Sequence, residues 1–515
     1  MLHAAARLRF THGVKTRLLV AASLFARAIF IVVHRLDSDE PQHLHVVWGW
    51  SRGLVQYRDL FDNHFPLLHL LFVPLMRLMP ESSATFFLMR LAIAPFAIAC
   101  GWLLYRIGRP LIGERRAVIA AVVFSVMPPW LAKSVEFRND TLWIFFWLAA
   151  LALVFGRERP AWLWAGAAAA LCLLASVKAL PLLLAHALAL ASQRQSYPAR
   201  PALRVACGAA VPLLAAALFL YLRGALDEMV YATLLFNASL PVQAGRRIAG
   251  ALAFVAIAPA LASRGRRSDH LTLVAIWFPV LLLCFWPSIT PRDFLPLVPL
   301  AALAVATIRM PVLIWTAALV ASICDARLWR PADLSRAKFV DAAVAVTAPD
   351  DYVFDLKGDA VFRRRPVFYI YDIVGRALTG NGTLPDRGPE EIVASHCCVA
   401  MPDLDHIPPR TRSFLNAHFV THGVLRVCGT LARDGAFNIA VPQTYAVIAP
   451  DPSRVVIDGV PYRGPRFLAA GRHTAQEEEG SGRLVRSSAC SQCGRDVRTP
   501  RGSGDIRIIW WRAAH

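Results

Sequence analysis

The chain has 515 residues, of which 56% are hydrophobic and only 17% are charged, and its mean hydropathy is +0.46. This composition excludes an ordinary soluble protein, in which about 25% of the residues are charged. The net charge of +20 does not require a nucleic-acid partner, because much of it lies in short arginine-rich joints between apolar segments. The composition therefore predicts a membrane protein.

Up to Asp325, long apolar runs alternate with short polar joints. A bilayer core about 30 Å thick requires about 20 apolar residues in a helix, so these runs predict a polytopic α-helical membrane domain over residues 1–324 with about eleven spans. The predicted spans are residues 17–34, 85–105, 117–132, 141–156, 161–177, 180–192, 203–222, 247–263, 271–287, 294–308 and 311–324.

Basic residues before the first span set the predicted orientation. Arg7, Arg9, Lys15 and Arg17 precede it, so the positive-inside rule places the N-terminus in the cytoplasm. No small-residue cleavage site follows this span, which is therefore predicted to be a retained helix and not a signal peptide. The arginine-rich joints then fall on the cytoplasmic side. An odd number of spans places the C-terminal part outside the cytoplasm.

The sequence after Asp325 changes to short alternating apolar stretches separated by turns such as Asn381-Gly382. This pattern predicts a soluble α/β or α+β domain over residues 325–474. Two roles remain equally open for it, namely binding a glycan or acceptor and capping the outer mouth of the membrane domain. Residues 475–515 are rich in Gly, Ser and Arg and are predicted to be a disordered tail.

Cysteines fall into two groups. Five of the ten lie in or beside apolar spans and are predicted to be packing residues. Disulfides are the leading interpretation for the others, because the predicted compartment is oxidising. A lone CxxC at Cys490 and Cys493 lacks the second pair that a zinc ribbon needs. The five outer cysteines are Cys397, Cys398, Cys428, Cys490 and Cys493.

Ionisable residues gather at the outer ends of the predicted spans. Solvated loop residues are the ordinary explanation, but charges recur at four outer joints on one predicted face, and charged groups at membrane depth usually face a cavity or a partner. The residues are Asp37, Asp39, Glu40, Asp62 and His64 in the first outer loop (35–84), Glu136, Arg138 and Asp140 in the second, Lys178 in the third, and Arg292 with Asp293 in the fourth.

The order of these residues resembles the GT-C-fold glycosyltransferases that use polyprenyl-phosphate sugars. That superfamily includes the dolichyl-phosphate-mannose protein mannosyltransferases and the bacterial enzyme that adds aminoarabinose to lipid A. Asp39-Glu40 resembles its Asp-Glu pair, and residues 62–67 resemble its Asp-x-His-Pro-Pro-Leu stretch, with Phe65 in place of the first proline. The resemblance covers about residues 15–310.

Three later segments continue the resemblance. Arg138-Asn139-Asp140 falls where the family carries an acid before a helix, and Arg292 to Pro299 resembles its Arg-Tyr-x-x-Pro-x-x-Pro segment. Lys178 stands where the family has a lysine, although the usual threonine and glycine around it are missing. His43 stands where a tyrosine commonly follows the Asp-Glu pair. The resemblance implies a multi-pass protein of the bacterial inner membrane whose donor is a polyprenyl-phosphate-linked sugar.

The residue types suit such a reaction. Negative charge grows on the lipid phosphate as the sugar leaves it, and cations stabilise this charge. Arg138, Lys178 and Arg292 are therefore predicted to bind the donor phosphate. A carboxylate must accept the proton of the acceptor, and Asp39 is the predicted base, with Glu40 and Asp140 as further catalytic candidates. Direct displacement with one base inverts the anomeric centre.

A divalent cation is a further possibility. Asp62 and His64 are the candidate ligands, and Glu40 and Asp140 have suitable chemistry as well. Plain hydrogen bonding is the alternative role for these residues.

Other functions remain open at this point. A transporter or lipid flippase predicts internal repeats and charges in the middle of helices, whereas the charges here lie at span ends. A non-catalytic binding protein predicts loss of the acids, which are present. A glycan polymerase or ligase of the same architecture is a further alternative, and the acceptor is a lipid, a glycan or a protein.

Overall fold

The computed structural model describes residues 2–192, 199–239, 245, 248, 269–286, 289–308, 310–330, 333–432, 434–477 and 506–511. It contains two compact units. Unit 1 comprises Met1–Pro80 and Ala84–Leu334, and unit 2 comprises Glu81–Ser83 and Ser335–His515.

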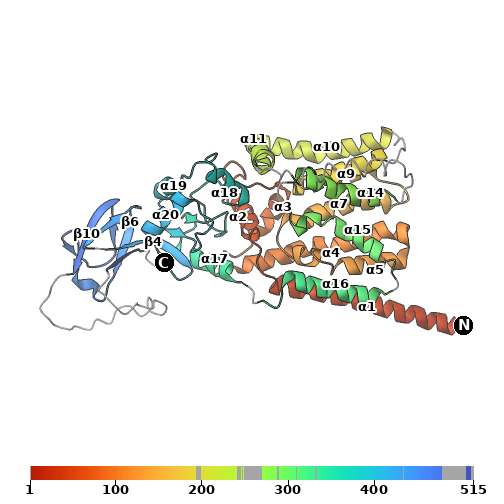
Figure 1. Ribbon diagram of the computed structural model, residues 1–515, viewed down its shortest axis with the longest axis horizontal. Helices are drawn as coiled ribbons and strands as arrows, with labels where there is room; N and C mark the ends of the chain where they lie inside the picture. The colour runs from red at the N-terminus through yellow and green to blue at the C-terminus, as the bar shows by residue number, and fades with distance from the viewer. Residues whose placement is uncertain are drawn as a thin grey trace. The chain divides into compact units, whose positions relative to one another are not determined.

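Unit 1 is built from helices, most of which lie side by side as a bundle, with the short helices α2 and α3 at one end of it (Figure 1). Its elements are α1 (Leu2–Val33), α2 (Glu40–Ser51), α3 (Leu67–Met76), α4 (Ala84–Ile112), α5 (Glu114–Phe124), α6 (Trp130–Lys133), α7 (Asn139–Phe155), α8 (Trp162–Ala175), α9 (Ala179–Ser192), α10 (Ala199–Leu222), α11 (Leu226–Val230), a π-helical turn (Tyr231–Leu235), α12 (Phe236–Ala238), α14 (Asp269–Phe285), a 3₁₀ turn (Pro291–Phe294), α15 (Leu297–Val305) and α16 (Pro311–Ala326).

The helices match the predicted spans in position more closely than in length. Among the described residues, three helical segments are long and apolar enough to cross a membrane, namely Thr16–Val33, Ala84–Ile112 and Arg200–Leu222. The count of eleven spans is therefore not confirmed. Predicted span 117–132 divides into α5 and α6 because a Pro128-Pro129 pair, which lacks backbone N–H donors, lies between them. Nearly all of predicted span 247–263 lies outside the described residues.

Close helix packing relies on glycine where α8 meets α10. A Cβ atom on Gly166 would lie 2.0 Å from the carbonyl oxygen of Val205, and one on Gly208 would lie 1.9 Å from that of Leu163. Small residues let the two backbones approach, as is typical of helices packed within a bilayer. This packing supports the membrane assignment of both helices.

Unit 2 is an α+β domain, as the alternating pattern predicts. Strands β1 and β2 pair in parallel, and the other strand pairs are antiparallel. One sheet has the order β1-β2-β4-β11-β6-β9, with β3 also paired to β4, and the second has the order β5-β10-β7-β8. The elements are α17 (Ser335–Val346), β1 (Val353–Phe354), α18 (Ile373–Gly380), α19 (Gly388–Ala394), β2 (Val399–Ala400), α20 (Pro409–His418), β3 (Phe419–His422), β4 (Leu425–Leu431), β5 (Ala436–Ile439), β6 (Gln443–Ile448), a 3₁₀ turn (Pro452–Arg454), β7 (Val455–Ile457), β8 (Val460–Pro461), β9 (Arg466–Leu468), β10 (Gly471–Glu477) and β11 (Arg507–Trp510).

The prediction of a disordered tail over 475–515 is wrong for two segments. Strand β10 continues to Glu477, and β11 pairs with both β4 and β6 inside the larger sheet. The sequence of β11, RIIW, places Ile508 in the core of unit 2, and burial of this side chain favours an ordered strand. Residues 478–505 and 512–515 lie outside the described residues.

The structure resolves three of the outer cysteines. Cys398 and Cys428 form a disulfide, which confirms one predicted use of these residues. Cys397 is buried and does not form a disulfide. Cys490 and Cys493 lie outside the described residues.

Candidate active site

Four predicted site residues lie at the N-terminal ends of helices in unit 1. Asp39 is the N-cap of α2, Arg138 is the N-cap of α7, Lys178 immediately precedes α9, and Arg292 lies in the 3₁₀ turn before α15. The first N–H groups of a helix have no partner within the helix and carry partial positive charge. An arrangement of helix N-termini and cations is suited to an anionic group.

Asp39 joins two of these segments. Its Oδ2 atom lies 2.6 Å from Nη1 of Arg138 and 3.1 Å from Nη1 of Arg292. Residues 253 positions apart in the sequence therefore meet at one carboxylate. The structure thus brings together three of the residues that were predicted from separate outer joints.

Arg138 is buried among carboxylates. Its guanidinium forms ion pairs with Asp37 and Asp39, and its Nε atom lies 3.2 Å from Oδ2 of Asp140. Only 3% of its side chain is exposed. Because its charge is already surrounded by acids, Arg138 is suited to holding these carboxylates in place.

Lys178 and Arg292 are the more accessible cations. Their side chains are 17% and 22% exposed, and Nζ of Lys178 lies 2.6 Å from Oδ1 of Asp293. Asp293 is itself fixed, because its Oδ2 atom accepts hydrogen bonds from the backbone and hydroxyl of Thr290. Each accessible cation therefore has one carboxylate partner that a ligand anion can replace.

Asp140 is the least satisfied acid of the site. Its side chain is 1% exposed, and neither carboxylate oxygen accepts a hydrogen bond from a described residue, although Arg138 lies within ion-pair distance. Buried carboxylates ordinarily accept several hydrogen bonds. Among the described residues, Asp140 is therefore held by the charge of Arg138 and not by hydrogen bonds.

Glu40 has a different environment from Asp39, its neighbour in the chain. Arg90 binds both of its oxygens, with 2.7 Å from Nε to Oε2, and the backbone N–H groups of Asp37 and Phe137 also donate to it. Both side chains of the pair are fully buried. Glu40 thus ties α4 to the segments that carry Asp37 and Arg138, and its oxygens are occupied.

Arg90 and Lys133 contribute two further cations that were not predicted from the sequence. Arg90 also donates to the carbonyl oxygens of Ile31, His34 and Arg35, and Nζ of Lys133 lies 2.7 Å from Oε1 of Glu136. A lone arginine inside the apolar run 85–105 is itself a signal, because an unpaired charge in a span is costly.

Asp37, in the first outer loop, forms ion pairs with Arg138 and Lys133. Burial raises the pKa of its carboxyl, but the neighbouring guanidinium of Arg138 opposes this effect, and the net pKa lies below the ordinary value. Asp37 therefore stays ionised and holds Arg138.

Asp62 and His64 belong to a separate buried network between α2 and α3. Asp62 accepts hydrogen bonds of 2.7 Å from the side-chain amides of Gln42 and Gln56, one on each oxygen, and lies 2.9 Å from Nδ1 of His64. Burial raises the pKa of Asp62, but His64 and these hydrogen bonds lower it below its ordinary value. Among the described residues, no group of three or more His, Cys, Asp or Glu is arranged to hold a metal ion. Both oxygens of Asp62 thus accept hydrogen bonds, which is the alternative role that the sequence leaves open for this residue.

The chain is similar to known proteins in part of its sequence and in its fold. Residues 66–197 match the family model described as dolichyl-phosphate-mannose-protein mannosyltransferase. The crystal structure of ArnT from Cupriavidus metallidurans in the apo state superposes with a TM-score of 0.55 and 16% identity, covering 80% of this chain and 96% of that one. The chain has the GT-C fold of the polyprenyl-phosphate-sugar-dependent glycosyltransferases.

The GT-C fold implied by the resemblance in the sequence is thereby confirmed. The structure of ArnT from Cupriavidus metallidurans bound to undecaprenyl phosphate is 17% identical, with a TM-score of 0.46, and the match covers 64% of this chain and 65% of that one. None of the curated proteins compared with the chain matches it.

Proposed function

We propose that this protein transfers a sugar from a polyprenyl-phosphate carrier to an acceptor at the periplasmic face of a bacterial inner membrane. The observation that carries the proposal is the contact of Asp39 with Arg138 and Arg292, which gathers a carboxylate and two cations from distant segments. The fold and the family model support this reaction class. The acceptor is a lipid, a glycan or a protein.

Lys178 and Arg292 bind the phosphate of the donor in this proposal. Lys178 immediately precedes α9 and Arg292 lies in the 3₁₀ turn before α15, both are partly exposed, and each is paired with a carboxylate. When the donor phosphate approaches, the guanidinium of Arg292 turns from Asp39 to a phosphate oxygen. The cations then stabilise the negative charge that grows on the phosphate as the sugar leaves.

The same exchange prepares Asp39 to act as the base. Release of Arg292 leaves Oδ2 of Asp39 with Arg138 as its partner, so the carboxylate can accept a hydrogen bond from the acceptor hydroxyl. The acceptor oxygen forms a bond to the anomeric carbon while the bond from that carbon to the phosphate oxygen breaks. The electron pair stays on the phosphate, the proton passes to Asp39, and the anomeric centre inverts.

Asp140 and Glu40 have different proposed roles. The oxygens of Asp140 accept no hydrogen bond from a described residue, so Asp140 orients the acceptor and is the second candidate for the base. Glu40 is a positioning residue, because both of its oxygens are bound by Arg90. It fixes the loop that presents Asp39.

The test is release of the lipid phosphate by the purified full chain in nanodiscs, supplied with undecaprenyl-phosphate-linked sugars and a bacterial cell-envelope extract that contains lipid, glycan and protein acceptors. Arg292→Gln should lower turnover, whereas Arg109→Gln should not, because the Arg109 side chain is 64% exposed and only loosely paired. Normal turnover in Arg292→Gln, or no sugar transfer from any donor by the wild-type chain, would overturn the proposal.

A further inference from the structure

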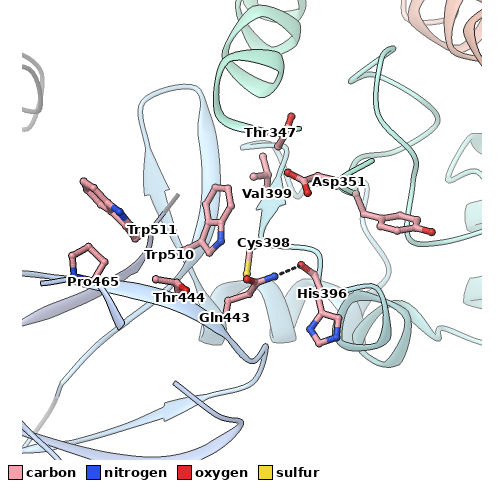
Figure 2. Close-up of a pocket in the computed structure, with 11 residues that line it drawn as sticks. Thr347, Asp351, His396, Cys398, Val399, Gln443, Thr444, Pro465, Trp510 and Trp511 are labelled. Carbon is pink, nitrogen blue, oxygen red and sulfur yellow. Dashed lines mark hydrogen bonds between the residues drawn. The ribbon is translucent and has the colours of Figure 1, made fainter. Parts of the chain in front are cut away.

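Unit 2 contains a cavity of about 560 Å³, which lies within the range of about 300–1,000 Å³ typical of small-molecule sites. It opens between the larger sheet and the segments that flank β1 and β2 (Figure 2). The described residues that line it include Asp351, Gln443, Thr444, Pro465, Trp510 and Trp511. None of the residues placed in the active site of unit 1 is among them.

Two indole rings supply the apolar part of the lining. Trp510 is the last residue of β11, Trp511 follows it, and both line the cavity together with Pro465 (Figure 2). Trp511 remains 38% exposed although tryptophan is a large apolar residue that is highly buried on average. Exposed aromatic surface at the wall of a cavity is suited to contact with the face of a ring.

Short polar side chains supply the rest. Asp351 carries a carboxylate, Thr444 carries a hydroxyl, and Gln443 carries an amide that donates a 3.4 Å hydrogen bond to the carbonyl oxygen of His396. The hydroxyl of Thr347 is already used, because it donates to the carbonyl oxygen of Ala343 and accepts from Nε of Arg363. These groups include both donors and acceptors. The lining therefore combines aromatic faces with a mixed set of hydrogen-bonding groups.

The described residues of the lining carry no fixed positive charge. The chain has 55 lysine and arginine residues, yet neither type occurs among the described residues that line the cavity, and Asp351 is acidic. Arg363 donates to the hydroxyl and carbonyl oxygens of Thr347, so its charge is held behind the wall. The described residues of the lining itself therefore offer a phosphate or another anion no permanent cation. The cavity is thus suited to an uncharged or cationic ligand with many hydroxyl groups.

We propose that this cavity is a saccharide-binding site. A sugar ring has an apolar C–H face and a rim of hydroxyls, which match the indole faces and the polar side chains respectively. The chemical class is a hydroxyl-rich pyranose or furanose unit without a phosphate or carboxylate. Its assignment as a sugar of the acceptor glycan rests on the proposed transfer reaction, whereas saccharide binding itself does not.

The surrounding structure holds the two tryptophans in place. Strand β11 pairs with β4 on one side and β6 on the other, and the backbone N–H of Trp511 donates to the carbonyl oxygen of Thr444 at 2.8 Å. The disulfide between Cys398 and Cys428 joins the cavity wall to β4. A preformed site of this kind loses little entropy when it binds a ligand.

The experiment uses the full chain in nanodiscs and saturation-transfer NMR with methyl glycosides of glucose, galactose, mannose, arabinose and N-acetylglucosamine. At least one glycoside should bind to the wild-type chain. Trp511→Ala, which removes a partly exposed side chain, should weaken that binding by about tenfold or more, as should Trp510→Ala. Phe467→Ala is the matched control, because Phe467 is an aromatic residue of the same sheet that is 65% exposed and does not line the cavity.

The outcomes separate this inference from the proposed function. No binding of any glycoside, or equal binding by wild type and both tryptophan variants, overturns the saccharide site. Preferential binding of an anionic competitor such as inorganic phosphate also overturns it. Lipid-phosphate release, measured in parallel, reports the active site: binding without release would leave the saccharide site standing while the transfer proposal fails.

Discussion

Glu40→Gln should destabilise unit 1, because it breaks the buried ion pair between Glu40 and Arg90 next to Asp39. The wild-type carboxylate accepts two hydrogen bonds from Arg90 and one each from the backbone N–H groups of Asp37 and Phe137. The amide of glutamine keeps one oxygen, and its NH₂ group faces a donor in place of the other. Arg90 is left as a buried charge, although it still donates to three carbonyl oxygens.

Removing one partner of a fully buried ion pair costs about 3–5 kcal/mol. For a domain larger than about 150–250 residues, each 1 kcal/mol lowers Tm by about 2 °C or slightly more, so a decrease of about 5–10 °C is expected. The assay is thermal unfolding of the purified chain in nanodiscs. Glu114→Gln is the control, because the side chains of Glu114 and Arg109 are 69% and 64% exposed and such pairs contribute at most about 1 kcal/mol.

A Tm of Glu40→Gln equal to that of Glu114→Gln would refute the structural role of this pair. A normal Tm together with a large loss of turnover would instead favour a catalytic role for Glu40. A lowered Tm with weaker donor binding and a modest fall in turnover is the result expected of a positioning residue.

Four further results are expected. Lys178→Ala should weaken donor binding in a donor-titration assay while the chain still folds; unchanged affinity would place the phosphate elsewhere. Burial, and to a lesser extent the neighbouring histidines, hold the pKa of His43 well below its ordinary value of 6.5. Below about pH 6.5 the unfolded chain therefore takes up a proton at this residue that the folded chain does not, so the free energy of unfolding decreases as the pH falls. Tm should therefore decrease between about pH 7.5 and pH 5.5, and less so in His43→Gln. Divalent-cation removal by EDTA should leave turnover unchanged, since both oxygens of Asp62 already accept hydrogen bonds; loss of activity restored by a divalent ion would contradict this. Cys398→Ser should cost about 3–4 kcal/mol, judged by the 30-residue separation that the disulfide closes, and a chemical-denaturation midpoint unchanged from wild type would contradict it.

Sequence patterns located the site residues because charges at the ends of apolar runs are rare and costly. Asp39, Arg138 and Arg292 were recognised in this way, and they meet in the structure. Their pairing was not predictable, since the end of a span does not specify which other span lies beside it. Arg90 was not recognised because it lies inside the apolar run 85–105, and its partner Glu40 is 50 positions away in the sequence.

In the C-terminal region, the sequence predicted disorder for a segment that forms a strand. Turn and strand signals predicted a mixed domain, but the composition of residues 475–515 favoured disorder and concealed β11. The short apolar run that forms β11 is ordered by its two neighbouring strands, β4 and β6, which lie far away in the sequence. Trp510 and the cavity that it lines were therefore beyond sequence reasoning. Non-local strand pairing is the physical reason.

The most direct test of the proposed mechanism is turnover in Asp39→Asn. Asparagine keeps the size of the side chain and one oxygen for Arg138, but it cannot accept the proton of the acceptor. Loss of a general base lowers rates by about 100-fold to 10,000-fold, which corresponds to about 3–5 kcal/mol in the activation free energy. Donor binding should be largely kept, because Lys178 and Arg292 are unchanged.

The measurement is transfer from a purified undecaprenyl-phosphate sugar by the full chain in nanodiscs, beside a donor-binding assay and with Glu114→Gln as the control. The proposed mechanism predicts a decrease in turnover within that range for Asp39→Asn and none for the control. Near-normal turnover in Asp39→Asn would contradict the assignment of the base and would make Asp140 the next residue to test.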